Sequence, residues 1–486
     1  MNDLVKMINF RTALYILSVS VIVTSCDNRS KNREITAHYF DKIKQQGDNA
    51  KLTMFFTQMP KGGDLHHHYS GALYVETYLD WAAGKNLRMN TTSFMLDTMQ
   101  TSITIDSLRS NDALYRKVLE EWSDADFSNN FHIENPPDQH FFNTFPFFGK
   151  IAAAFCREGL AEIKQEAVKE NVQYIETQLG SPKVHEQFRG SLTDSLVYFQ
   201  SKKDTLHIFQ IFNLMVQAIQ VNPSYDAAMM NYVDSLHSYH QGIDDSNFTM
   251  RFQVYCVRRL PPQAVFTSLY GCFDAVTRDR STLIVGVNIV APENDYVSMR
   301  DYWLHMQMFR YLKKKFPTVK TDMHAGELSL GMVKPVDLTY HINDAVFTAG
   351  ADRIGHGVDI PYETNAPELL KKMKKDSIAV EINLTSNEFI LGVKGNDHPV
   401  NLYNDAGVPI VISTDDEGVS RNNLASQYVL LASRYHFSYN QIKTFVYNSI
   451  RYSFLSKSEK MALEEKLNKR FDAFEAMIAQ DHGNGK

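Results

Sequence analysis

The sequence is poor in the residues that build covalent or phosphate-binding frameworks. It has only four cysteines in 486 residues, and no two of them form a Cys-x-x-Cys pair. A zinc site built on cysteine thiolates is therefore excluded, and any zinc site must use His, Asp and Glu. No glycine-rich phosphate loop follows the first expected strand, which disfavours a dinucleotide-binding sheet.

Long runs of one charge are also missing. The 50 basic and 56 acidic residues give a formal net charge of −6, with no long basic block. A nucleic-acid backbone or an anionic membrane surface is therefore not expected as a partner, and no obligate protein partner is indicated. The composition, 44% hydrophobic and 22% charged, is that of an ordinary globular protein. No fixed-period repeat or low-complexity tract is present.

An apolar run lies at the N-terminus. Lys6 and Arg11 precede ALYILSVSVIVTSC, which is too short for a comfortable membrane-spanning helix and has the three regions of a secretory signal. The run ends in VTSC, which resembles a bacterial lipobox. We therefore expect residues 1–25 to be a lipoprotein signal peptide and Cys26 to carry a lipid anchor. The mature chain would be exported and membrane-anchored, facing the periplasm or the cell exterior. A plain signal peptide or an uncleaved anchor is the alternative.

A polar stretch follows this signal, and residues 26–50 are expected to form a flexible tether and N-terminal segment. Lipidation of Cys26 would leave Cys156, Cys256 and Cys272, which are too few for a complete disulfide framework. Stability must therefore come from packing within residues 51–486, which we interpret as one catalytic domain.

The order of elements predicts the fold. From about residue 60, short β-rich runs alternate with helical stretches, which is typical of a parallel sheet flanked by helices. The eight expected strands are 63–68, 172–179, 250–257, 282–290, 319–324, 353–357, 378–384 and 409–415. Eight β/α units predict a closed (β/α)8 TIM barrel of the α/β class. An open, doubly wound sheet is the competing arrangement.

Two regions exceed a minimal barrel. Residues of about 82–140 and 199–247 are expected to be insertions after strands 1 and 2, lying over the barrel mouth or its side. The chain beyond the last strand has the pattern of extra C-terminal helices packed outside the barrel.

Histidines and an acid gather at the ends of expected strands. His66 and His68 project to the same face, because alternate residues of a strand share a face, whereas His67 points away and is interpreted as structural. His324 ends the fifth strand, and Asp415 ends the eighth, which adjoins the first in a closed barrel. Barrel enzymes keep their active sites at this end of the strands, so the pattern indicates a 3His-1Asp site for one divalent cation.

Three further groups lie on the same rim. They are Glu327, which follows a small Ala-Gly corner, His356, which stands between two glycines, and Asp416, which follows the last expected ligand. A metal lowers the pKa of a bound water, His356 would orient or deprotonate that water, and Glu327 would deliver a proton elsewhere on the substrate. As an alternative, the paired Asp415-Asp416 could cap a helix.

Five motifs carry a resemblance to a known family. MPKGGDLHHHYSGAL, HAGE, RIGHG, LTSN and STDDEGV, in that order from residue 59 to residue 419, resemble the adenosine deaminase family of metal-dependent purine deaminases. The MPKGG opening, the long insertion and the secretory signal are most similar to its secreted, growth-factor-type (ADGF-like) branch. The resemblance implies one Zn²⁺ per chain and hydrolytic deamination of adenosine or 2′-deoxyadenosine, which releases ammonia. It also implies a small-molecule purine nucleoside as the partner.

The resemblance assigns roles to matching residues. His66, His68, His324 and Asp415 match the zinc ligands, Glu327 the acid that protonates purine N1, His356 the residue that orients the attacking water, and Asp416 the acid hydrogen-bonded to N7. Further expected substrate contacts are Ser70, Glu176, Ala291 and Gly326.

Departures from the family pattern concern the sugar side. The family often has an acid near the ribose where this chain has Ser70, a glycine near purine N3 where it has Ala291, and an aspartate where it has Asn288. The implied chemistry at C6 is unaffected, but recognition of the sugar is left open.

Three alternatives remain from the sequence. The first is a deaminase of another 6-aminopurine, such as adenine or a 5′-modified adenosine. The second is a different amidohydrolase, although the expected fourth strand, 282–290, has no lysine to bridge two metals and so favours one metal. The third is a purine-binding lipoprotein that has lost catalysis.

Overall fold

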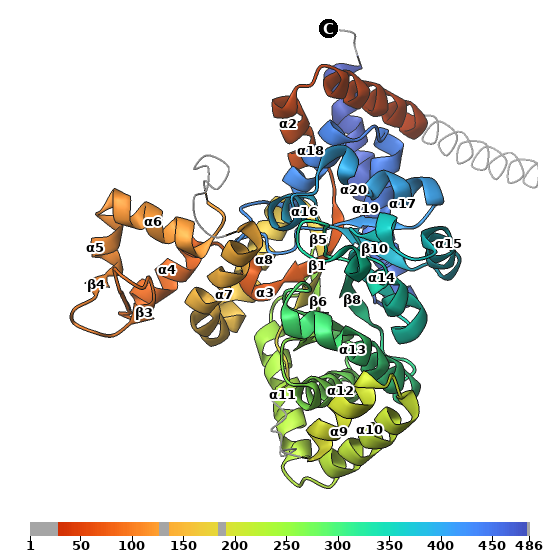
Figure 1. Cartoon of the computed structure of the whole chain (residues 1–486). Coiled ribbons are helices and arrows are strands. Elements are labelled where there is room, and N and C mark those ends of the chain that lie inside the picture. Colours follow the sequence, from red (N-terminus) through yellow and green to blue (C-terminus); the bar gives the residue numbers. More distant parts are fainter. Residues whose placement is uncertain (1–27, 126–135, 183–190, 484–486) are drawn as a thin grey trace, which may run out of the picture.

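Eight parallel strands form the centre of the molecule in the computed structural model, which describes residues 28–125, 136–182 and 191–483 (Figure 1). They are β1 (Gly62–His68), β5 (Val172–Gln178), β6 (Thr249–Val257), β7 (Ile284–Val290), β8 (Asp322–Ala325), β9 (Arg353–His356), β10 (Ala379–Ile382) and β11 (Ile410–Ile412). They pair as two four-stranded sheets, β1-β5-β6-β7 and β8-β9-β10-β11. Bridges from His67 to Asp415 and from Val287 to Thr321 join the two sheets, so the predicted barrel is closed.

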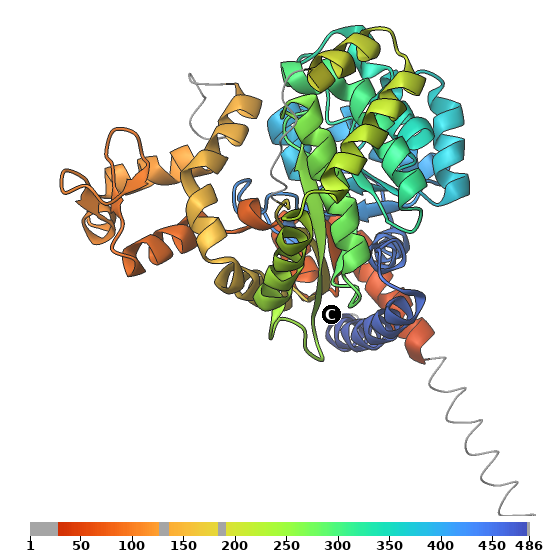
Figure 2. The same cartoon turned by 90° about the horizontal axis from the view of Figure 1, so that it is seen from below.

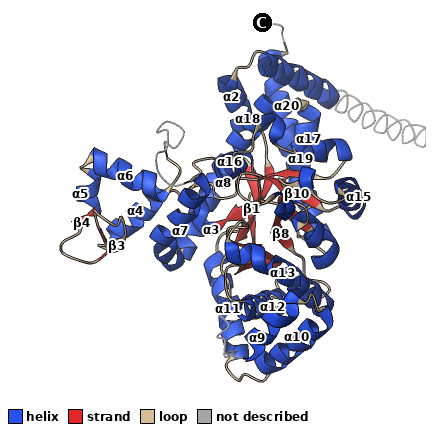
Figure 3. Cartoon of the chain, viewed as in Figure 1, coloured by secondary structure: helices blue, strands red, loops and turns tan. Residues whose placement is uncertain are grey.

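Helices surround these strands (Figure 3). Among them are α8 (Cys156–Lys169), α12 (Pro262–Arg278), α13 (Tyr296–Lys315), α15 (Ala366–Asp376) and α17 (Val400–Ala406). In α12, Val265, Leu269 and Cys272 are buried at helical spacing, which gives the helix an apolar face toward the strands. Every residue of β5 is buried, as expected for a parallel strand covered on both faces. The predicted (β/α)8 fold is confirmed.

The first insertion forms a lobe that projects to one side of the barrel (Figures 1 and 2). It contains α4 (Val75–Gly84), the short antiparallel strands β2 (Arg88–Met89), β3 (Leu96–Asp97) and β4 (Ile103–Thr104), and the helices α5 (Ile105–Arg109) and α6 (Asp112–Trp122). Helix α7 (Pro137–Ala154) then returns the chain to the barrel, where it contacts α8 and the short helix α3 (Tyr69–Ala72).

The second insertion is helical. It comprises α9 (Ser191–Ser201), α10 (Thr205–Gln220) and α11 (Tyr225–His240), which pack against α12 and, through α10, against α13. After the last strand come α18 (Leu424–Arg434), α19 (Tyr439–Arg451) and α20 (Lys457–His482), which are the predicted C-terminal helices.

The expected tether is partly wrong. Residues 28–45 form a helix whose Phe40 and Ile43 are buried. Tyr39 stacks on His482 of α20 with ring centroids 3.7 Å apart, so this helix packs against the C-terminal helix. The polar composition of this segment predicted a tether. A local pattern could not show the helix, because its packing partner lies more than 400 residues away in sequence. The expected signal peptide and Cys26 lie outside the described residues. Within the described ranges, no helix is both long and apolar enough to span a bilayer.

Candidate active site

The C-terminal ends of β1, β8 and β11 bring the four expected metal ligands together. His66 Nε2 and His68 Nε2 each lie 3.3 Å from Asp415 Oδ1. His68 Nε2 also lies 3.2 Å from His324 Nε2. His67 points elsewhere and places its Nδ1 2.9 Å from Thr177 Oγ1. Three imidazoles and one carboxylate thus converge on one point, which is a donor set suited to zinc.

Hydrogen bonds on the far ring nitrogens orient two of these imidazoles. His66 Nδ1 lies 2.8 Å from Glu381 Oε2, and His324 Nδ1 lies 2.8 Å from Asn288 Oδ1. Both partners are oxygen acceptors, so each Nδ1 carries the proton and each Nε2 presents a lone pair to the cluster. His66 Nε2 is buried without a hydrogen-bond partner, which fits a nitrogen that ligates a cation.

Distance alone does not separate the ligands from their neighbours. The ligand atoms of His66, His324, His356 and Asp415 lie within 4.8 Å of one another, and His68 belongs to a second such group with Asp415 and Asp416. The protonation of His356 makes the distinction.

His356 has its proton on the nitrogen that faces the cluster. Asn387 directs Nδ2 at His356 Nδ1, 3.0 Å away, because its Oδ1 is engaged by His398 Nε2 at 3.0 Å. The amide N–H donates to Nδ1, so in the neutral ring Nε2 carries the proton. Burial lowers the pKa of His356 to about 3, which keeps the ring neutral. A protonated Nε2 cannot ligate a metal, but it can hold a water by donating a hydrogen bond.

Two carboxyl groups beside the cluster have raised pKa values. Burial, and then the neighbouring Asp415 carboxylate, raises the pKa of Asp416 well above its usual range. Burial, Asp415 and Glu293 do the same to the pKa of Glu327. The shift favours the protonated form of both groups, which can donate a proton or a hydrogen bond.

Glu293, in the loop after β7, holds the corner that carries Glu327. The Glu293 carboxylate accepts hydrogen bonds from the backbone N–H of Glu327 at 2.8 Å and of Gly326 at 3.2 Å. His341 Nδ1 lies 2.5 Å from the same carboxylate. The two backbone hydrogen bonds fix the position of Glu327 without using its side chain.

Several residues of the rim have a left-handed backbone. The φ angles of Asp415, His356 and Ala291 are 65°, 66° and 90°, a region that costs non-glycine residues roughly 1–3 kcal/mol. Such strain is commonly found at functional sites. Gly71 has a different role, because a Cβ there would lie 1.5 Å from Asp416 Oδ1. Sequence reasoning missed Gly71, although the SGAL segment that contains it is part of the first motif.

A cavity of about 260 Å³ opens onto this cluster. Its polar lining consists of His68, Ser70, Arg259, His324, Glu327, His356, Asp415 and Asp416. Its apolar wall includes Phe141, Phe142 and Phe145 from α7, together with Tyr255 and Val290. An aromatic wall opposite a few polar groups suits a flat, polar ring. Sequence reasoning missed this wall, because nothing local in an insertion shows that it returns to the barrel mouth.

Two of the four further contact residues line the cavity. Ser70 and Ala291 do so, but Gly326 does not. The N–H of Gly326 donates to Glu293, and its carbonyl accepts from the N–H of Val358 at 2.8 Å. The expected substrate contact at Gly326 is therefore replaced by a structural role.

Glu176 also lies away from the cavity lining. It is fully buried in the barrel, where it accepts from Arg353 Nη2 at 2.7 Å and from the Phe454 N–H at 2.6 Å. The alternation of side chains along a strand can predict that a residue points into a barrel, but it does not show how far that residue lies from the mouth of the barrel. The expected contact between Glu176 and a substrate is therefore corrected to a structural role.

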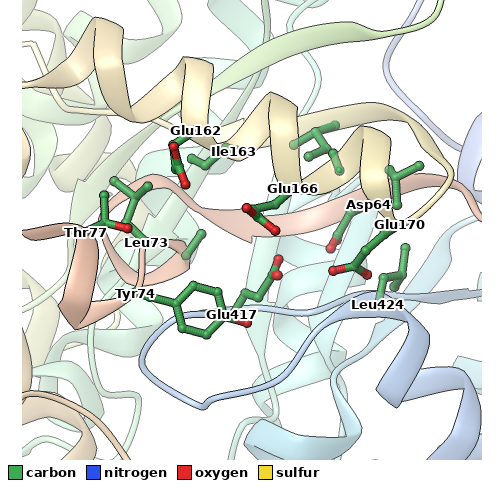
Figure 4. A pocket seen from close by; sticks show the side chains of 14 residues that line it. Asp64, Leu73, Tyr74, Thr77, Glu162, Ile163, Glu166, Glu170, Glu417 and Leu424 are labelled. Carbon is green, nitrogen blue, oxygen red and sulfur yellow. The ribbon is translucent and has the colours of Figure 1, made fainter. Parts of the chain in front are cut away.

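A smaller cavity, of about 20 Å³, lies between β1 and α8 (Figure 4). Acidic side chains face it, namely Asp64, Glu162, Glu166, Glu170 and Glu417. Asp64 accepts from Thr414 Oγ1 at 2.6 Å and from the Thr414 N–H at 3.1 Å, which ties β1 to the segment that carries Asp415. None of the cluster residues lines this cavity, so we assign the active site to the larger one.

The fold and the cluster define a class of protein, a (β/α)8 barrel with a buried His-Asp cluster able to hold a metal at its C-terminal mouth. Residues 139–470 match the family model for adenosine deaminase. The adenosine deaminase of Clostridium kluyveri is 24% identical over 420 residues, which cover 85% of this chain and 93% of that protein. The chain belongs to the adenosine deaminase family.

Solved structures share the fold. The adenine deaminase from Arthrobacter aurescens superimposes with a TM-score of 0.54 at 15% identity, over 84% of this chain and 98% of that one. An amidohydrolase from Burkholderia ambifaria with bound Zn gives a TM-score of 0.52 at 18% identity, over 88% of this chain and 94% of that one. At these identities the likeness concerns the fold.

Proposed function

We propose that the protein catalyses the hydrolytic deamination of adenosine or 2′-deoxyadenosine with one Zn²⁺ per chain. Water adds at purine C6, ammonia leaves, and inosine or 2′-deoxyinosine is the product. The observation that carries the proposal is the combination of a cluster of imidazoles and a carboxylate with two further buried carboxyl groups, Glu327 and Asp416, at one cavity. Family membership supports purine deamination, and the particular nucleoside is part of the proposal.

His66, His68, His324 and Asp415 would hold the zinc ion. When bound, the ion supplies a Lewis acid that lowers the pKa of a bound water toward neutrality. The buried acceptors Glu381 and Asn288 would keep two of the imidazoles in the ligating tautomer.

The protein's own groups would handle the proton transfers. Addition at C6 places electron density on N1, and protonated Glu327 donates there. His356, with its proton on Nε2, orients the attacking water on one face of the ring. Protonated Asp416 donates to N7, which is an acceptor. The water gives up two protons in all: one is taken up by the leaving amino group, so neutral ammonia departs, and the other restores the proton that Glu327 gave to N1.

The test is ammonia release from a panel of 6-aminopurines by the chain beginning at Asn28, with zinc supplied. Adenosine or 2′-deoxyadenosine should have the highest kcat/KM. If protein with stoichiometric zinc releases ammonia from no member of the panel, the proposal is rejected and a binding role is favoured. A clear preference for adenine would favour the alternative substrate.

A second candidate function is the deamination of a 5′-modified adenosine. The observation that favours it is in the cavity wall, where Ser70 offers a hydroxyl in place of a carboxylate and Arg259 adds a positive charge. A panel that includes 5′-substituted nucleosides decides between the two.

We also propose that the chain is an exported lipoprotein anchored through Cys26. The support is the N-terminal sequence alone, with its basic residues, apolar run and terminal VTSC.

A further inference from the structure

The two sheets of the barrel meet between β7 and β8, where backbone pairing is sparse. Across the described residues, these strands are joined by one isolated bridge, between Val287 and Thr321. Nearer the mouth, the N–H of Ile289 donates to the Asn288 side chain at 2.7 Å, so it is not available to β8. The proposed zinc ligand His324 lies in β8 beyond the bridge. Its main chain therefore needs another support on the β7 side.

Arg258 provides this support. It directly follows β6 and is fully buried. Its Nη2 donates to the carbonyl oxygen of Ile289 at 3.0 Å and to that of His324 at 2.8 Å. A side chain from the end of β6 thus ties β7 to β8 at the level of the His-Asp cluster.

The same guanidinium lies beside the carboxylate that holds Glu327. Arg258 Nη1 lies 3.6 Å from Glu293 Oε1, and Glu293 accepts from the N–H groups of Gly326 and Glu327. The main chain from His324 to Glu327 is therefore held at a carbonyl oxygen by a cation and at two N–H groups by an anion. Both ions are buried and within ion-pair distance of each other.

Arg258 has no direct route to a substrate. The next residue, Arg259, lines the catalytic cavity, whereas Arg258 does not. Any effect of Arg258 on the reaction must therefore pass through the main chain that it holds.

Resting on the proposed function, we propose that Arg258 is a positioning residue for the deamination. By holding the corner between β8 and the next loop, it sets the place of the His324 imidazole among the proposed ligands and of the Glu327 carboxyl against purine N1. Partners behind a metal ligand typically contribute about 10–100-fold in metal affinity or activity. A misplacement of about 1 Å in an active site can cost about 10²-fold in rate.

The variant Arg258→Met tests this role, because it keeps an apolar stem of similar length and removes the donors. In the chain beginning at Asn28, zinc affinity measured by chelator competition should fall by about 10–100-fold. The visible absorption bands of the cobalt-substituted protein should shift, because they report the arrangement of the ligands. With zinc in excess, kcat for adenosine should fall at least about tenfold with little change in KM, since the lost positioning acts in the transition state.

Lys61→Met is the matched control. Lys61 is also a fully buried cation that binds two backbone carbonyl oxygens, those of Met59 at 3.1 Å and Glu170 at 2.6 Å. It directly precedes β1, so it lies at the opposite end of the barrel from the His-Asp cluster. Its loss should lower stability in urea without changing zinc affinity, the cobalt spectrum or kcat.

Arg258→Lys is the second variant. It keeps a cation that can donate to a carbonyl oxygen, so its zinc affinity and kcat should lie between those of wild type and Arg258→Met. Wild-type zinc affinity, cobalt spectrum and kcat in Arg258→Met, or equal losses in Arg258→Met and Lys61→Met, would overturn the inference. If Arg258→Met does not fold, wild-type behaviour of Arg258→Lys in all three measurements overturns it.

The inference and the proposed function fail separately. Zinc affinity and the cobalt spectrum are measured without turnover, so they report on Arg258 even in a protein that deaminates no 6-aminopurine. A wild-type protein that deaminates adenosine, combined with an Arg258→Met variant that matches it in every measurement, removes the positioning role and leaves the proposed function intact.

Discussion

At the scale of single residues, proton positions decide what each group at the barrel mouth can do. Burial alone would raise the pKa of Asp415, but the neighbouring imidazoles of His66 and His68 hold it well below its usual range, which favours the ionised form. Asp416 and Glu327 lie beside it, and burial together with the Asp415 charge raises the pKa of both. Like charges in one buried site disfavour full ionisation, which suits the proposed roles of one carboxylate as a ligand and two carboxyl groups as donors.

Glu327 should act in the chemical step and contribute little to metal binding. Glu327→Gln keeps the shape and a hydrogen-bond donor, but an amide cannot deliver a proton. We expect kcat to fall by at least about 10² with zinc content near wild type. Metal analysis and steady-state deamination on one preparation measure both quantities. Zinc lost in proportion to activity would instead make Glu327 a ligand, and near-normal turnover would remove it from the mechanism.

His324, a proposed zinc ligand, should be indispensable. His324→Ala removes one imidazole from the cluster and should abolish both stoichiometric zinc and deamination. His67→Ala is the matched control, since His67 lies in β1 but bonds Thr177; it should keep its zinc. If His324→Ala binds one zinc per chain as tightly as wild type, the ligand set is misassigned.

The neutral partner of His324 should limit metal affinity. Asn288 accepts the Nδ1 proton of His324, whereas Glu381 offers a carboxylate to His66. A carboxylate raises the basicity of the imidazole it binds, so Asn288→Asp should tighten zinc binding by about tenfold. Glu381→Gln should weaken it by about 10–100-fold. Chelator competition measures both variants, and equal affinities in all three proteins would show that these partners do not tune the site.

At the scale of elements, one buried arginine joins four strands. Arg353 of β9 lies 2.7 Å from Glu176 of β5, 3.3 Å from Asp322 of β8 and 2.5 Å from Glu381 of β10. Its guanidinium also lies 3.8 Å from the centre of the Phe454 ring. A single cation thus contacts three carboxyl groups inside the barrel, one of which orients His66.

Removing this cation should destabilise the barrel. Arg353→Met leaves three buried carboxylates without their partner and should lower the free energy of unfolding by about 3–5 kcal/mol. Urea unfolding of the metal-free protein measures the change. Lys320→Met is the control, because Lys320 is 52% exposed and its pair with Asp352 should contribute at most about 1 kcal/mol. A similar loss in both variants would contradict the assigned role.

The clamp from the β7 loop should depend on pH. Burial alone would raise the pKa of Glu293, but His341, Arg258 and the backbone N–H of Glu327 lower it to about 2. Because the folded-state pKa lies below the unfolded value, the stabilisation is present above about pH 4.5 and is lost as the pH falls toward 2. Glu293→Gln should cost on the order of 3 kcal/mol at pH 7 in metal-free protein. A difference from wild type that stays constant down to pH 2 would contradict this account.

At the scale of the whole molecule, both insertions contribute to the barrel mouth. The first insertion returns through α7, which supplies the phenylalanine wall of the cavity. The second contributes α9 and the turn after it to a neighbouring pocket, which shares Arg259 with this cavity. The barrel thus provides the reacting groups, and segments added to it provide the walls around the ligand.

The N-terminal sequence predicts where the protein resides. Cys26→Ser removes the thiol that a lipid would modify, so lipid labelling should be lost and the mature chain should leave the membrane fraction. Labelling with a radioactive fatty acid and cell fractionation measure the two effects. Wild-type protein recovered unlabelled outside the membrane would contradict the lipobox interpretation.

The sequence by itself determined the barrel and the order of its chemistry. Two local patterns carry this information, namely the succession of eight β/α units and the alternation of side chains along each strand. They place His66, His68, His324 and Asp415 at strand ends. The family motifs lie at the same strand ends, and membership of the family is confirmed.

Only the tertiary structure decided which groups meet across the barrel. Glu176 and Arg353 are 177 residues apart in sequence, and the hydrogen bond between them shows that Glu176 has a structural role in place of the expected substrate contact. The proton on His356 depends on Asn387, and the helix at residues 28–45 depends on α20. These contacts depend on which side chains become neighbours when the barrel closes. A local sequence pattern does not show which distant residues will be neighbours.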